Sequence, residues 1–150
     1  MTHVNILVTP LPTSVAVGGV THPIAFGYRT GIQVARAAES DLPEELKAAT
    51  ILALYFKDAI PEDTQGALDA ALAFHRCGQS IPTRRSRKRV WDWDHDAGRL
   101  LADFRREYGI DLADPATRMH WWTFMAYFDN LTSESETKQA LTYRGGNRPR

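Results

Sequence analysis

The densest run of aromatic side chains is the feature that most limits how this chain can fold. Five aromatic residues fall within eight positions: Trp121, Trp122, Phe124, Tyr127 and Phe128. Neighbouring residues of a helix project about 100° apart, so these rings cannot all face one spot of a core. A helix that is apolar around most of its circumference lies at the centre of a domain or presents part of itself to a partner. The run favours a core position. A contact surface remains open, because Trp and Tyr are common in binding hot spots, and the five are our candidate partner-binding residues.

Cap signals predict two helices in the first half, after one that runs from Tyr28 to about residue 39. Asp41, followed by a proline and two glutamates, is typical of a helix start, and the helix should reach about Phe56. Its second half, 51–56, is apolar all round and predicts deep burial, with a strand as the alternative. Asp63 predicts the next cap. That helix should have an apolar face of Ala67, Leu68, Ala71, Leu72 and His75 and should end at Gly78.

The second half of the chain carries stronger helical patterns. Asp94 predicts the cap of a helix that ends at Gly109. Its two faces divide into an apolar set, Ala97, Leu100, Leu101, Phe104 and Tyr108, and a solvent set, Arg99, Asp103, Arg106 and Glu107. Asp114 and Pro115 predict the start of the aromatic helix, which should run to Leu131. Ser133 and Glu136 have capping-box spacing for a last helix around 138–143.

Near the N-terminus the pattern is that of a β-hairpin. Residues 14–17 and 20–24 flank Gly18 and Gly19, which readily adopt the positive φ of a two-residue turn. The fold class is therefore mainly α: a small helical domain of about six helices with an N-terminal hairpin. We expect a hairpin with helices over 1–78, a basic flexible linker over 79–90, the helical second half of the same domain over 91–144 and a disordered tail over 145–150.

Charge and composition exclude several classes of protein. The formal net charge is zero, yet residues 76–90 carry six basic and no acidic side chains within an acidic body. A general nucleic-acid binder usually has a larger basic excess, so nucleic acid is not the expected partner. No run approaches the roughly 18 apolar residues of a membrane span, and Cys77, as the one cysteine, cannot form an internal disulfide. We expect a cytoplasmic protein.

The basic loop is formed by Arg84, Arg85, Arg87, Lys88 and Arg89. A solvated linker is the favoured interpretation. Electrostatic contact with phosphates or with an acidic partner surface remains open.

One cluster has the composition of a metal or acid–base site: Asp92, Asp94, His95 and Asp96. A calcium loop would need further ligands in register, and none follows, so helix capping is the favoured interpretation. The chain has no HExxH, GxSxG, Walker or GxGxxG motif. His75, on an apolar face, is typical of a hydrogen-bonded core histidine, and nothing beside Cys77 completes a nucleophile–base pair. We expect no catalytic site, no metal and no cofactor.

The order of several short motifs resembles a known family. The motifs are Leu11 to Val15, Tyr28 to Thr30, Phe74 to Gly78, the basic linker, Trp91 to Asp96, Phe104 with Tyr108-Gly109-Ile110-Asp111-Leu112, and His120 to Phe124. Over about residues 10–144 this order is similar to the bacteriophage gene-product-fifteen proteins. The most specific pieces are the Tyr-Gly-Ile-Asp-Leu stretch and the His-Trp-Trp-x-Phe run.

That resemblance implies a tail assembly chaperone of a long-tailed phage, acting in the host cytoplasm. Its partner would be the tape measure protein, with the major tail protein and self-association as further contacts. Two alternatives stay open: a structural tail or head–tail component of the virion, and a nucleic-acid-binding phage regulator that uses the basic loop.

Overall fold

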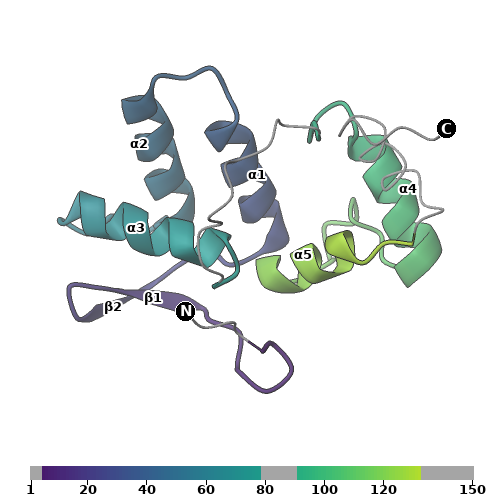
Figure 1. Ribbon diagram of the computed structural model, residues 1–150, viewed down its shortest axis with the longest axis horizontal. Helices are drawn as coiled ribbons and strands as arrows, with labels where there is room; N and C mark the ends of the chain where they lie inside the picture. Colours follow the sequence, from purple (N-terminus) through teal and green to yellow (C-terminus); the bar gives the residue numbers. More distant parts are fainter. Residues whose placement is uncertain (1–4, 79–90, 133–150) are drawn as a thin grey trace, which may run out of the picture. The chain divides into compact units, whose positions relative to one another are not determined.

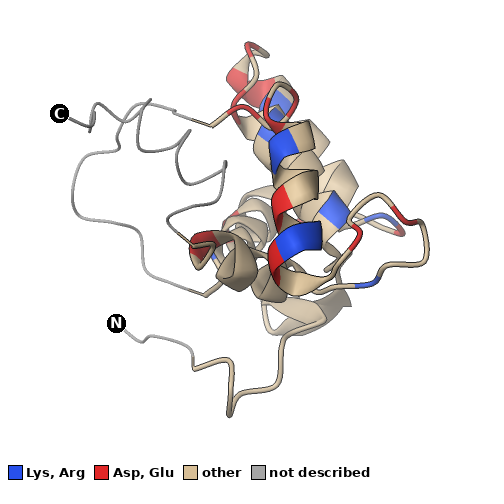
Figure 2. Cartoon of the chain, turned by 90° about the vertical axis from the view of Figure 1, so that its right-hand side faces the viewer, with Lys and Arg blue, Asp and Glu red and all other residues tan. Residues whose placement is uncertain are grey.

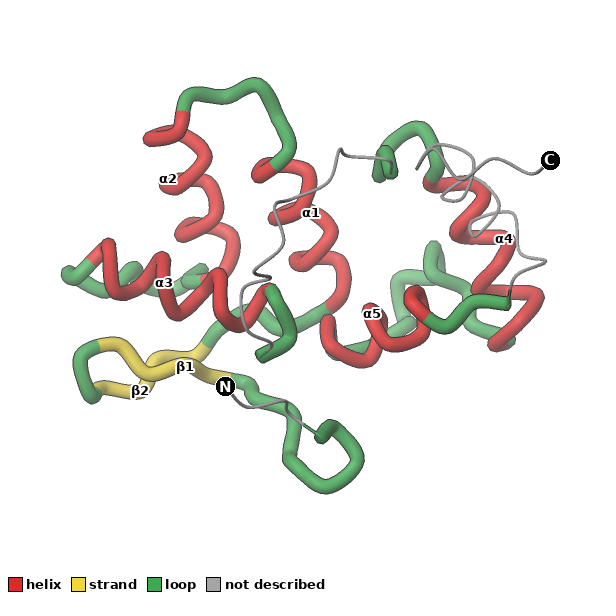
Figure 3. The backbone as a smooth tube through the Cα atoms, viewed as in Figure 1, coloured by secondary structure: helices red, strands yellow, loops and turns green. Residues whose placement is uncertain are grey.

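The computed structural model describes residues 5–78 and 91–132. In chain order the elements are β1 (Ser14–Val17), β2 (Val20–Pro23), α1 (Tyr28–Ala38), α2 (Glu44–Tyr55), α3 (Thr64–His75), α4 (Ala97–Tyr108) and α5 (Trp121–Asp129), as Figures 1 and 3 show. The mainly helical fold with an N-terminal hairpin is confirmed, with five helices in the described part. The predicted last helix, the basic linker and the C-terminal tail lie outside the described residues.

Contacts divide the described chain into two compact units. The first comprises residues 5–78 together with 119–124, and the second comprises residues 91–118 together with 125–132. Helix α5 therefore contributes its first turn to one unit and its later residues to the other. The division into 1–78 and 91–144 as parts of one domain stays a prediction.

In the first unit, the hairpin packs against α3, and α2 packs against both α1 and α3. The two strands pair antiparallel from Ser14 opposite Pro23 to Val17 opposite Val20. Gly18 and Gly19 form the turn with φ of 59° and 82°, values that the twist of a hairpin favours and that glycine adopts without strain.

Helix α2 forms as predicted, which excludes the alternative strand, but two details of the prediction are wrong. Asp41 does not cap it: the N-cap is Pro43, without a side-chain hydrogen bond. The carbonyl of Pro43 accepts the first helical hydrogen bond, from Lys47. Burial is also one-sided, because Ile51, Leu52, Tyr55 and Phe56 are buried whereas Ala53 is exposed. The apolar second half thus leaves one face in solvent.

Both ends of α3 follow local chemistry. The Asp63 carboxylate accepts a hydrogen bond from Gly66 N–H at 3.0 Å, which confirms the predicted cap. At the other end the first left-handed residue is Cys77, with φ of 61°, and Gly78 follows at 73°. Their N–H groups donate to the carbonyls of Phe74 and Ala73, a Schellman motif with cysteine in the position that glycine usually takes.

In the second unit, α4 ends at Gly109 in the left-handed conformation, as predicted. Its faces differ from the prediction: Asp103 is fully buried, whereas Leu101 and Ala97 are exposed. Arg106, one turn later, forms an ion pair with Asp103. Burial of the carboxylate is therefore compensated by charge pairing, which an apolar-periodicity argument does not consider.

Helix α5 starts at Trp121, six residues after the predicted start at Pro115. The Asp114 side chain does accept a hydrogen bond from Ala116, but it closes a short turn that also uses Thr117. Met119 to Trp121 instead pair with Phe26 to Tyr28: Tyr28 N–H donates to Met119 O at 2.9 Å, and Trp121 N–H donates to Phe26 O at 2.8 Å. This long-range pairing keeps residues 119–121 extended, so the helix begins later in the sequence than predicted.

Candidate partner-binding site

The first turn of α5 inserts both of its tryptophans against the C-terminal end of α3. Trp121 Nε1–H donates to the carbonyl of His75 at 3.0 Å, and Trp122 Nε1–H donates to the carbonyl of Phe74 at 2.8 Å. The last carbonyls of a helix have no partner within the helix. The two indoles therefore supply donors to α3 while burying their apolar rings.

His75 lies at the centre of this aromatic cluster. Its ring stacks on Trp121, with centroids 5.1 Å apart, and its Nδ1 lies 2.8 Å from the hydroxyl of Tyr55. Burial, helped by the neighbouring charge of Arg76, lowers the pKa of His75 to about 4. Burial also raises the pKa of Tyr55, so both groups of this contact are uncharged at neutral pH. The predicted hydrogen bond of this histidine is confirmed, and its side chain is half-buried.

The side chain of His120 forms hydrogen bonds both to the segment before β1 and to the start of α5. Its Nδ1 accepts a hydrogen bond from Trp122 N–H at 3.0 Å, so the ring caps the helix and its proton resides on Nε2. Nε2–H then donates to the carbonyl of Pro12 at 2.7 Å. Burial lowers the pKa of His120, although the bond to Pro12 works in the opposite direction. A neutral imidazole fits both contacts, whereas a proton on Nδ1 would abolish the cap.

Gly31, in the middle of α1, makes room for the indole of Trp121. A Cβ built on Gly31 would lie 2.1 Å from ring atoms Cδ2 and Cε3 of Trp121. The indole also stacks on Phe124, which stacks in turn on Tyr28. Sequence reasoning missed Gly31, because the only signal was a glycine inside a helical pattern.

The five predicted partner-binding residues are mostly interior. Trp121 (2% exposed), Trp122, Phe124 and Phe128 are buried, and Tyr127 is the member with substantial exposure, at 36%. This placement favours the core role that the aromatic run already suggested. Binding of a partner through these residues stays a prediction, and of the five only Tyr127 offers it accessible surface.

In the second unit, aromatic rings surround the later part of α5. Phe128 contacts Trp91 and Trp93, and Tyr127 packs on Tyr108, whose hydroxyl donates to the carbonyl of Tyr127 at 2.6 Å. A surface depression of about 410 Å³ lies beside them, lined by Arg106, Glu107, Tyr108, Asn130 and Thr132. Its polar groups are engaged with one another or with neighbours: Glu107 accepts from Thr132 and Arg106 pairs with Asp103. The depression therefore offers few groups to a small ligand.

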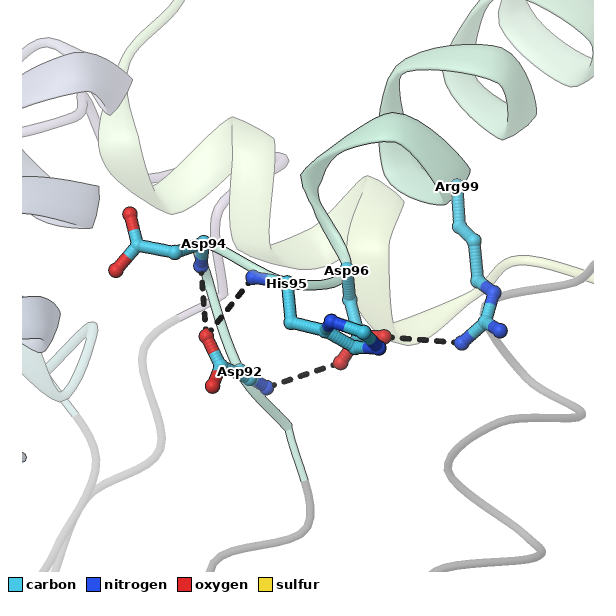
Figure 4. A network of polar contacts seen from close by, with 5 residues as sticks. All are labelled: Asp92, Asp94, His95, Asp96 and Arg99. Atoms are coloured by element: carbon cyan, nitrogen blue, oxygen red, sulfur yellow. Dashed lines mark hydrogen bonds and ion pairs between the residues drawn. The ribbon is translucent and has the colours of Figure 1, made fainter.

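The acidic cluster before α4 forms a network of polar contacts in the turn that precedes the helix, as Figure 4 shows. One oxygen of Asp92 accepts from the N–H groups of Asp94 and His95, each at 2.9 Å. The carboxylate of Asp96 accepts a hydrogen bond from the N–H of Asp92 and also forms an ion pair with Arg99 at 2.9 Å. The two backbone hydrogen bonds lower the pKa of Asp92. The N-cap of α4 is Asp96, without a side-chain capping hydrogen bond, so the predicted cap by Asp94 is wrong and the cluster instead holds the turn before the helix.

Within the described ranges, no group of three or more His, Cys, Asp or Glu side chains is placed to hold a metal ion. Among the same residues, none of the helices has the length and apolar character needed to cross a membrane. The predicted electrostatic loop, Arg84 to Arg89, lies outside the described residues.

Two accessible apolar surfaces were not predicted as sites. The first is the N-terminal turn, where Leu7 and Val8 are 89% and 77% exposed. Hydrogen bonds to Asn5 hold this turn: Leu7 N–H donates to the Asn5 side chain at 2.9 Å, and Thr9 N–H donates to the Asn5 carbonyl at 3.0 Å. The second is the outer face of α2. Sequence patterns find core residues readily but do not say which apolar side chains stay outside.

Comparison with known proteins gives one match. The family model described as Bacteriophage Gp15 protein matches residues 7–150. No curated protein and no solved structure matches the chain. The family match covers nearly the whole sequence and agrees with the motif order from Leu11 to Phe124. The chain belongs to the bacteriophage Gp15 protein family.

Proposed function

We propose that this protein is a tail assembly chaperone that binds the tape measure protein of its phage and keeps it soluble while the tail tube assembles. The proposal rests on membership of the bacteriophage Gp15 family and on the chaperone role that the resemblance to this family implies. A chaperone of this type binds its client reversibly, has no need of a catalytic centre and acts in the host cytoplasm.

The observation that carries the proposal is the ordered apolar turn at Ile6, Leu7 and Val8. Each of these three side chains is exposed, and the segment 5–12 has no charged residue. Exposed apolar side chains gain free energy when a partner covers them, at about 25 cal/mol per Å². The Asn5 hydrogen bonds fix the turn before binding, which reduces the entropy lost when a client docks.

The test is affinity capture of the tape measure protein from the same phage by the full chain. We expect capture by the wild type and a loss of at least about tenfold for the double variant Leu7→Ser/Val8→Ser, which removes apolar contact area. Val20→Ser is the matched control, because Val20 is also exposed but lies at the hairpin. Equal capture by both variants would show that the turn is not the client contact. No capture by the wild type would remove the chaperone proposal itself.

A structural component of the virion is the second candidate, because membership of the family supports it equally. Mass spectrometry of purified mature particles separates the two. The chaperone should be absent from particles, whereas a tail or head–tail component should be present in fixed stoichiometry.

A further inference from the structure

The N-terminal part of the described chain carries no charged side chain. Residues 5–28 contain no Asp, Glu, Lys or Arg, although these four types make up 24% of the whole chain. In Figure 2 the segment that leads from the N-terminal end is uniformly tan, whereas blue and red lie along the helices and their connections. The uncharged stretch also holds five of the ten large apolar side chains that are exposed in the described residues: Ile6, Leu7, Val8, Val20 and Phe26. Single exposed apolar residues are ordinary, but their concentration in one uncharged stretch is typical of a surface that a partner covers.

Phe26 is exposed and yet firmly held. Its side chain is 41% exposed, while its carbonyl accepts the hydrogen bond from Trp121 N–H at 2.8 Å. Its ring stacks on the imidazole of His120, with centroids 5.4 Å apart and planes at 20°. Aromatic residues are enriched at protein interfaces, and a side chain that is already fixed loses little entropy when a partner covers it. Phe26 therefore has the properties of a preformed anchor.

One imidazole holds both Phe26 and the segment that bears the exposed turn. His120 Nε2–H donates to the carbonyl of Pro12 at 2.7 Å, and within the described ranges this is the one hydrogen bond that joins segment 5–12 to the rest of the chain. Val8 lies four residues before Pro12, so their Cα atoms are at most about 14 Å apart. The turn and Phe26 therefore lie within reach of a single partner segment.

The hairpin keeps Val20 away from this region. Val20 pairs with Val17 beside the turn of the hairpin. At the open end, Ile24 N–H donates to the carbonyl of Thr13 at 3.2 Å. A strand rises about 3.3 Å per residue, so the four steps from Val20 to Ile24 cover about 13 Å. In Figures 1 and 3 the segment before β1 leaves the open end and turns outside α1, α2 and α3. We define the N-terminal apolar surface as Ile6, Leu7, Val8 and Phe26.

We propose that the N-terminal apolar surface is where the client binds and that it takes an apolar client segment without charged side chains. Within the chaperone function proposed above, on which this rests, Phe26 is a second anchor beside the turn. The client segment would lie across the turn and the exposed side of the Phe26 ring.

The absence of charge determines the chemistry of the segment that fits. A charged client side chain would lose water on this surface without gaining a counter-ion, because residues 5–28 offer none. Arg29, the first charged residue after this stretch, lies over the ring of Tyr28. Burial lowers the pKa of His120, so the imidazole adds no charge at neutral pH. Aliphatic and aromatic side chains lose no such hydration and gain from leaving water.

The first test is capture of the tape measure protein from the same phage by the full chain. Phe26→Ser removes the exposed ring and should weaken capture about fivefold or more, as for an interface aromatic. Phe26→Leu keeps much of the apolar area and should lose less. Leu42→Ser is the matched control, because Leu42 is equally exposed, at 40%, but lies between the acidic residues Asp41 and Glu44. Thermal unfolding of each variant identifies any that does not fold.

The second test places a charge of either sign beside the turn. Thr9 is exposed, and its N–H donates to the carbonyl of Asn5, a bond that a new side chain leaves in place. Thr9→Lys and Thr9→Asp should both weaken capture, by about threefold or more, because neither charge finds a counter-ion on an uncharged segment. A charged client segment would instead be favoured by one sign and disfavoured by the other.

Salt gives a third measurement, on the wild-type chain. Capture should change by less than about twofold between about 0.05 M and 0.5 M NaCl, since salt screens contacts between charges and leaves apolar contacts in place. A contact through basic or acidic side chains would weaken steeply over the same range.

The inference is overturned if the wild type captures its client while Phe26→Ser behaves like Leu42→Ser. Opposite effects of Thr9→Lys and Thr9→Asp, or loss of capture at high salt, would also overturn it, because either result assigns the contact to charged groups. A wild-type chain that captures no tape measure protein at either salt concentration would remove the proposed function itself, and this inference with it.

Discussion

The indole of Trp121 lies directly against the backbone of Gly31, ninety residues earlier in the chain, at a distance that leaves no room for a side chain there. The ring cannot easily move away, because its Nε1–H donates a hydrogen bond to the carbonyl of His75 and the rings of His75 and Phe124 stack on it. The packing of Trp121 in α5 thus requires a residue without a side chain at position 31 of α1.

Replacement of Gly31 by alanine should destabilise the protein. Alanine favours a helix over glycine by about 1 kcal/mol, but overpacking costs typically about 1–3 kcal/mol and sometimes more. We expect a net loss of up to about 2 kcal/mol in the free energy of unfolding, measured by urea denaturation. Gly98→Ala is the matched control: a Cβ on Gly98 meets nothing within 4 Å, so that variant should be neutral or slightly more stable. A stable Gly31→Ala protein would contradict the close contact.

Substitution of Cys77 by glycine should increase the stability of the protein. A non-glycine residue in the left-handed region costs about 1–2 kcal/mol, and Cys77 has φ of 61°. Cys77→Ala removes the same sulfur but keeps the strained Cβ, so it isolates the backbone effect. Thermal unfolding should show Cys77→Gly more stable than Cys77→Ala by about 1 kcal/mol. Equal stability of the two variants would mean that the backbone is relaxed at this position.

Stability should fall as the pH is lowered from about 6.5 towards 4. The folded protein holds His75 and His120 with lowered pKa values, so the unfolded chain binds more protons in this window. The contribution is present in full above the unfolded pKa and is lost as pH falls to that of the folded state. His75 alone accounts for up to about 3 kcal/mol, from its pKa of about 4.

Urea unfolding at several pH values tests this dependence. His75→Asn keeps an acceptor for Tyr55 but does not titrate, so its stability should vary less with pH between 6.5 and 4.5 than that of the wild type. Gln33→Asn changes an exposed side chain that does not titrate and should follow the wild-type curve. Parallel curves for wild type and His75→Asn would rule out a buried neutral imidazole at His75.

The side chain of Asp92 should stabilise the turn that precedes α4. A hydrogen bond contributes about 0.5–1.5 kcal/mol net to stability, and one to a charged group about 1.5–3 kcal/mol. Asp92→Ala removes the oxygen that accepts from Asp94 and His95. In chemical denaturation this variant should therefore lose about 1–2 kcal/mol in the free energy of unfolding, and Asp92→Asn, which keeps an acceptor oxygen, should lose less. Equal losses for the two variants would contradict the role of this oxygen as an acceptor.

Much of the local structure could be predicted from the sequence because its causes are local. The Gly18-Gly19 turn, the Asp63 cap and the end of α4 at Gly109 each depend on residues within a few positions. The start of α5 could not be predicted, because Met119 to Trp121 pair with a segment more than ninety residues earlier. Burial of Asp103 escaped the same reasoning, since the ion pair with Arg106 compensates for it.

The candidate site was predicted less well for a related reason. The aromatic run identified the most constrained part of the chain, but its constraint is interior packing of Trp121, Trp122, Phe124 and Phe128. The accessible apolar residues, among them Leu7 and Leu46, belong to segments without a distinctive motif. Exposure depends on which neighbours cover a side chain, and only the folded chain decides that.

The chaperone role is tested most directly by the soluble yield of the tape measure protein expressed with and without this chain. The account predicts that the tape measure protein is soluble in a defined complex when both are present and aggregates when it is alone. A tape measure protein that is equally soluble alone, or that aggregates equally with this chain present, would contradict the proposed function.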